Sequence, residues 1–107
     1  MSARALSERL RLIEHFKGIF REAAKERPKR DKLVKVEGER WEEFEWIFHE
    51  RKVMCDEVNL LRSERGLPPV DIKEIKRVEG WAVGHCDYSV KFSLYCAELS
   101  MGERPVP

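Results

Sequence analysis

The side chains best suited to nucleophilic chemistry lie together near position 86. His85 precedes Cys86, and Asp87, a candidate helix cap, follows it. A thiol just before a helix can become a reactive thiolate, because the helix N-terminus favours negative charge. A catalytic cysteine also needs a shaped pocket and an oriented base, for which a helical chain of 107 residues leaves little room. We therefore interpret Cys86 as a thiol in a connecting segment and predict that the chain is not an enzyme.

Histidine and cysteine spacing also gives no support for a metal site. His49 and Cys55 are six residues apart, and Cys96 stands ten residues after Cys86. Zinc sites usually contain two close ligand pairs, and the sequence has neither Cys-x-x-Cys nor His-x-x-x-His. A glycine-rich phosphate loop is absent too. We predict no metal and no cofactor, and an odd cysteine count without an apolar signal segment predicts reduced thiols.

A basic stretch at positions 25–35 is the strongest charge feature. It carries six cations and two acids, a local charge of +4, whereas residues 37–50 carry six glutamates and one arginine. One hypothesis is that the stretch contacts phosphate groups of a nucleic acid. The alternative is that it folds over its acidic neighbour or stays solvated. No aromatic residues interleave it for base stacking. The candidate phosphate contacts are Arg27, Lys29, Arg30, Lys32 and Lys35.

Glycine and proline are scarce, which favours long helices. Apolar residues recur at three- and four-residue spacing over 5–26, and the interval 39–65 has no helix breaker before Gly66 and Pro68. Asp71 and Asp87 are candidate caps of two further helices, the first ending near Gly84. Residues 88–96 also alternate as a strand would, but the pattern continues in helical spacing, so we predict a helix.

These elements predict one all-α domain over residues 1–107. We expect a small three- or four-helix bundle built around one long central helix, with a basic linker at 27–38 and a short flexible tail at 102–107. No apolar run approaches the roughly 20 residues that span a bilayer, so we expect no membrane contact. The charged N-terminal stretch contains no signal core, which makes the cytoplasm the expected location.

The long helix carries more apolar surface than one core-facing stripe requires. Ile47, Met54 and Leu61 share one line, and Trp46, Val53 and Leu60 share another about 100° away. Phe48 and Cys55 lie about 100° away on the other side of the first line, so the apolar arc covers roughly 200°, about twice that of a surface helix. We therefore predict a second docking face, whose candidate residues are Trp41, Trp46, Arg51, Val53 and Leu60.

Self-association into a homodimer is the simplest use of such a face, and binding to a host protein is the alternative. The C-terminal pattern "GHCDYSVKFSLYCAEL" resembles small uncharacterised proteins encoded by bacteriophages of actinobacteria. This resemblance covers roughly the last forty residues of the chain. It implies a small phage accessory protein expressed in a bacterial cytoplasm, and it implies no catalytic residue.

Overall fold

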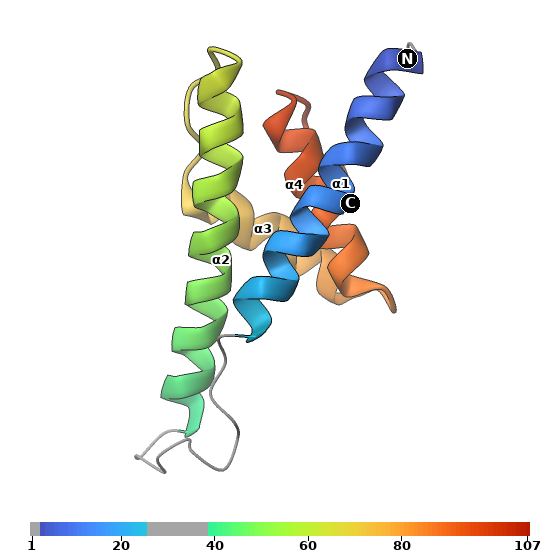
Figure 1. The fold of residues 1–107 in the computed structure, drawn as a ribbon. Coiled ribbons are helices and arrows are strands. Elements are labelled where there is room, and N and C mark those ends of the chain that lie inside the picture. The colour runs from blue at the N-terminus through green and yellow to red at the C-terminus, as the bar shows by residue number, and fades with distance from the viewer. Residues whose placement is uncertain (1–2, 26–38) are drawn as a thin grey trace.

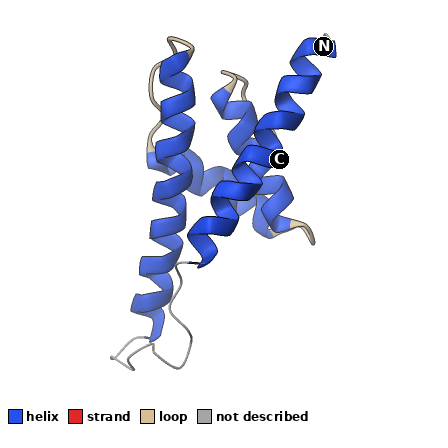
Figure 2. Cartoon of the chain, viewed as in Figure 1, coloured by secondary structure: helices blue, strands red, loops and turns tan. Residues whose placement is uncertain are grey.

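Four helices make up the described part of the chain. The computed structural model describes the backbone of residues 3–25 and 39–107, and the side chains of residues 3–25 and 50–107. Figures 1 and 2 show the helices crossing at steep angles, and no strand occurs within these residues. The predicted all-α bundle is thus confirmed, as is a helix over 88–96. The helices are α1 (Ala3–Lys25), α2 (Glu39–Glu64), α3 (Ile72–Val83) and α4 (Tyr88–Ser100).

The short helix α4 is the most completely buried element. It contacts α1, α2 and α3, whereas α1 and α3 do not contact each other. Helix α2 also contacts all three of the others, as expected of a long central helix. Burial on several sides explains why α4 lacks a clear polar face, and so resembled a strand in sequence. Its buried residues are Phe92, Ser93, Tyr95, Cys96, Ala97, Leu99 and Ser100.

Helix α1 turns a different line of residues inward from the one its sequence emphasises. Leu12 and Phe16 are buried in the core, but Leu6 and Leu10 are 50% and 57% exposed. Figure 1 shows the first turns of α1 reaching past the end of α4. These two leucines therefore have too few neighbours to be covered, although their spacing is that of a core stripe.

Glycines with positive φ end α2 and α4 in the same way. At the end of α2, Gly66 has φ +73°, and the Leu67 N–H donates to the Arg62 carbonyl at 2.9 Å. Gly102 has φ +79° after α4, where the Glu103 N–H donates to Glu98 at the same distance. Both are Schellman turns, in which only glycine adopts the left-handed position without strain. The predicted helix stop at Gly66 is confirmed.

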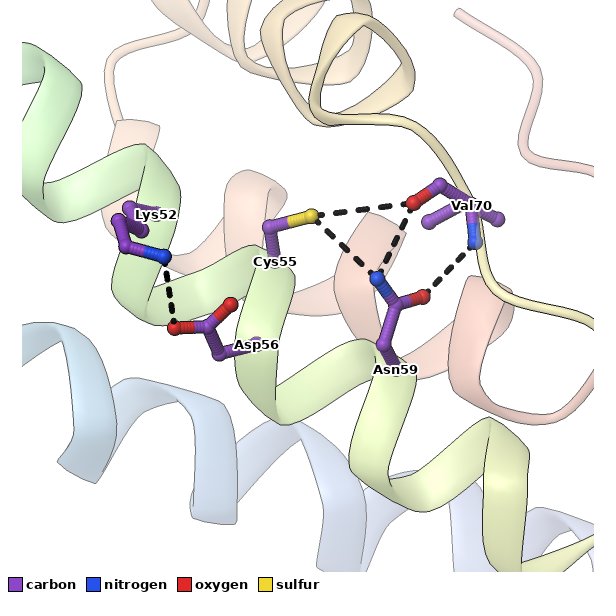
Figure 3. A network of polar contacts seen from close by, with 5 residues as sticks. All are labelled: Lys52, Cys55, Asp56, Asn59 and Val70. Carbon is purple, nitrogen blue, oxygen red and sulfur yellow. Dashed lines mark hydrogen bonds and ion pairs between the residues drawn. The ribbon is translucent and has the colours of Figure 1, made fainter.

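The α2–α3 connection positions α3 through a cap and a side-chain clamp. Asp71 accepts a hydrogen bond from the Lys73 N–H at 2.9 Å, which confirms the predicted cap. Asn59 on α2 accepts from the Val70 N–H at 2.8 Å and donates to the Val70 carbonyl at 3.1 Å. Figure 3 shows that both atoms of the Asn59 amide point at Val70. The chain is therefore fixed one residue before the α3 cap.

Two residues of the C-terminal segment 102–107 contact the rest of the fold or are covered by it. Glu103 forms an ion pair with Arg9 on α1. Pro105 is buried. The ion pair and the burial of Pro105 depend on tertiary packing, and so could not be foreseen from local composition.

Candidate interaction surface

An apolar line lies on the side of α2 away from the completely buried Met54 and Val58. Leu60 is 54% exposed and Val53 is half-buried, whereas Met54 and Val58 on the inner face are completely buried. Position 46 lies seven residues before Val53 on the same continuous helix, and so falls on the same line. We call positions 46, 53 and 60 the outer stripe of α2. The predicted side chains of Trp41 and Trp46 lie outside the described residues.

Charged side chains border the outer stripe on both flanks. On one flank, Lys52 and Asp56 form an exposed pair with the Lys52 Nζ 3.5 Å from Oδ2 (Figure 3). On the other flank, Glu57 lies 2.7 Å from the His15 Nε2 of α1. An apolar line with a polar rim is the arrangement typical of a protein interface.

Arg51 does not belong to this stripe, although it was grouped with the predicted interface residues. Its Nε donates to Oε1 of Glu79 on α3 at 2.6 Å, and only 19% of its side chain is exposed. The structure thus places Arg51 inside the bundle. The sequence did contain a signal for this inward position. Arg51 lies between Phe44 and Val58 around the helix, and Val58 lies in the core.

The Arg51–Glu79 pair belongs to a buried polar cluster at the meeting point of three helices. Tyr88 at the start of α4 donates to Oε2 of Glu79 at 3.2 Å. Burial, followed by the neighbouring Glu79 carboxylate, raises the pKa of Tyr88 well above its ordinary value. Tyr88 is therefore a neutral hydrogen-bond donor at physiological pH. Glu50 is also buried, with 2% of its surface exposed.

The cysteines divide into one exposed and two buried thiols. Cys86 is exposed in the α3–α4 connection, next to the equally exposed His85 and Asp87. These three described residues share no side-chain hydrogen bond that would orient a base toward the thiol. Burial raises the pKa of Cys55, and it raises that of Cys96 still further. None of the three thiols thus combines exposure with an activating partner within the described chain.

The structure describes most candidate metal ligands, but none of the candidate phosphate-binding residues. Within residues 3–25 and 50–107, no three histidine, cysteine or carboxylate side chains gather closely enough to hold a metal ion. The five candidate phosphate-binding residues, Arg27, Lys29, Arg30, Lys32 and Lys35, lie outside the described residues. Among the helices that are described, none combines the length and apolar character needed to cross a membrane.

Comparison with protein-family models, curated proteins and solved structures finds no match to this chain. A functional argument therefore depends on the surface of this fold. Two surfaces differ from an ordinary solvated face: the outer stripe of α2, and the side of α1 that carries Arg4, Arg11, Arg21 and Lys25.

Proposed function

We propose that the chain is a non-enzymatic protein-binding protein that acts through the outer stripe of α2. The observation that supports this proposal is the contrast around one helix. Met54 and Val58 are completely covered by the chain itself, whereas Leu60, on the opposite side, is more than half exposed. An apolar side chain that gains cover on association contributes about 25 cal/mol for each Å² removed from water.

A second copy of the chain is the simplest partner for the stripe. Positions 46, 53 and 60 are equally spaced along α2. Two α2 helices can therefore pack antiparallel about a two-fold axis that passes through position 53. Position 53 then meets its own copy, and position 46 meets position 60 of the other chain. An isologous contact of this kind closes as a homodimer.

A host protein is the alternative partner, in line with the resemblance of the C-terminal segment to phage proteins. In that case the same stripe would receive an apolar helix face or groove of the host protein. The two versions differ in a measurable property, because only self-association depends on the concentration of this chain alone.

Light scattering coupled to size-exclusion chromatography tests the self-association version at micromolar concentration. We expect a dimer of the 12.7 kDa chain and its conversion to a monomer by Leu60→Asp. Trp46→Asp should act in the same direction. Val83→Asp on α3 is the matched control, because Val83 is 66% exposed and lies away from the stripe. Far-UV circular dichroism of each variant separates loss of association from loss of fold.

Two results would contradict self-association. One is a monomer for the native chain over the whole concentration range, and the other is equal dissociation by Leu60→Asp and Val83→Asp. A monomeric native chain leads to the host version, which is tested by pull-down from host cytoplasm with native and Leu60→Asp protein. Capture of the same proteins by both baits would overturn the docking role of the stripe.

A further inference from the structure

A line of cations runs along the outward side of α1. Arg4, Arg11 and Lys25 are exposed, and together with Gly18 they are spaced seven residues apart, so they share one side of the helix. This line lies about 120° or more around the helix from the buried Phe16. Arg21, also exposed, stands beside Lys25 on this side. We call Arg4, Arg11, Arg21 and Lys25 the basic face of α1.

The acids of α1 leave much of this charge uncompensated. Glu14 pairs with Lys17 at 3.1 Å, and Glu22 pairs with Lys25 at 3.0 Å. Glu8 lies against Arg65, in the turn that follows α2, and its contact with Arg11 is long, at 4.0 Å. Within the described residues, Arg4 and Arg21 have no acidic partner. Glu14 and Glu22 are exposed on the same side of the helix, so the basic face together with these two acids carries a net charge of +2 toward solvent.

The small net charge of the chain conceals a strong division along it. The first 36 residues hold eleven cations and five acids, whereas the remaining 71 hold ten cations and fifteen acids. The local charges are thus +6 and −5, although the whole chain carries only +1, and α1 itself contributes +3 of the +6, from six cations and three acids. Steering of a polyanion depends on this local field and not on the net charge.

The composition of the line fits a phosphate backbone better than a protein partner. A protein interface needs an apolar centre, and none of the residues at 4, 11, 18 and 25 is apolar and large. The exposed Leu6 lies about 100° or more from this line, whereas the exposed Leu10 lies about 60° from Lys25 and stands beside Arg21. A phosphate backbone needs only cations and close approach.

Length and shape favour a duplex. From Arg4 to Lys25 the helix rises by about 32 Å, close to one turn of double-stranded DNA. Gly18 stands between Arg11 and Lys25, and a Cβ there would have no heavy atom within 4 Å. The missing side chain leaves room for a sugar–phosphate strand to approach the helix backbone between the two cations.

We propose that the basic face of α1 binds the sugar–phosphate backbone of double-stranded nucleic acid. The contact is independent of the outer stripe of α2 and reads no base sequence. With about four phosphates engaged, the affinity falls roughly 100-fold when salt rises from 50 to 200 mM.

Fluorescence anisotropy tests this proposal with the full chain and a labelled DNA duplex of arbitrary sequence. The duplex has ~30 base pairs, which is about three helical turns. The double variant Arg11→Glu/Arg21→Glu should abolish binding at about 50 mM salt. Phosphate contacts are strong at this low salt concentration, so their loss is easiest to detect there. The matched control is Lys73→Glu/Lys76→Glu on α3, which changes the net charge equally at exposed positions. Arg11→Gln/Arg21→Gln should weaken binding and flatten the salt dependence, and this milder variant guards against unfolding by the charge reversals.

Several outcomes overturn the proposal. These are no binding at low salt, equal loss with the α1 and α3 variants, and equal binding of poly-glutamate. Loss with Lys29→Glu/Arg30→Glu but not with the α1 variants would also overturn it, and would assign phosphate contact to the basic stretch alone. An A-form RNA duplex in place of DNA distinguishes the two kinds of duplex.

Discussion

Arg51 on α2 and Glu79 on α3 form an ion pair inside the bundle, with the Arg51 Nε 2.6 Å from Oε1 of Glu79. Only 6% of the Glu79 side chain is exposed. Its second oxygen accepts a hydrogen bond from Tyr88 at the start of α4. One carboxylate thus joins three helices, and its charge is compensated within the fold.

Removing one member of this pair should destabilise the fold strongly. Arg51→Met leaves the Glu79 carboxylate buried without its cation, which costs about 3–5 kcal/mol of unfolding free energy. Urea denaturation followed by circular dichroism measures the change. The double variant Arg51→Met/Glu79→Leu should regain most of the loss, because no charge then remains unpaired. A loss below about 1 kcal/mol for Arg51→Met, the level of an exposed pair, would contradict this account.

Asn59 should contribute more to the free energy of unfolding than an ordinary surface amide does. Asn59→Ala leaves the Val70 N–H and carbonyl without their side-chain partner, at a cost of about 1–3 kcal/mol. Lys52→Ala is the matched control on the same helix, because it removes only the exposed contact with Asp56 and should change stability by less than about 0.5 kcal/mol. Equal urea midpoints for the two variants would show that water replaces the clamp.

The helices could be predicted because their limits are set by local chemistry. The limits of the predicted ranges 5–26 and 39–65 lie within two residues of those of Ala3–Lys25 and Glu39–Glu64. Gly66 ends α2 through its positive φ, and Asp71 begins α3 through a cap only two residues away from its partner. Signals of this kind lie within a few residues of the structure that they determine.

The roles of individual side chains depended on packing that local patterns do not encode. Arg51 and Glu79 are 28 residues apart, and they meet only because α2 and α3 cross at that level. Leu6 and Leu10 have core spacing, yet they extend beyond the core. For the candidate site, periodicity placed Leu60 on an outer line and it is exposed there, but the partner of that line is a property of two molecules.

The three thiols should differ sharply in their reaction with a disulfide reagent. Cys86 is exposed, so one equivalent should react fast in the native protein. Cys55 and Cys96 should react slowly, because burial limits access and raises the pKa of both thiols, which lowers the thiolate fraction. Absorbance with Ellman's reagent follows the kinetics. Cys86→Ser should remove the fast phase, and unfolding in urea should restore rapid reaction of the remaining two.

Glu98 on α4 should give stability an unusual pH dependence. Partial burial raises its pKa, and the neighbouring Glu103 raises it further, while Arg9 and Lys91 act in the opposite direction. The folded state thus holds the proton more tightly than the unfolded chain. This carboxyl stabilises the fold fully below its ordinary pKa, and the contribution is lost as pH rises through the raised pKa.

Glu98→Gln should therefore raise the thermal midpoint at pH 7, because a neutral amide avoids the cost of a partly buried charge. The advantage should shrink as the pH falls below the ordinary glutamate pKa, at about 4, because the native carboxyl is then protonated as well. Thermal melts at both pH values measure the difference, with the exposed Glu14→Gln on α1 as the control. A lower midpoint for Glu98→Gln at pH 7 would mean that attraction to Arg9 and Lys91 outweighs burial, which is the reverse of the order inferred here.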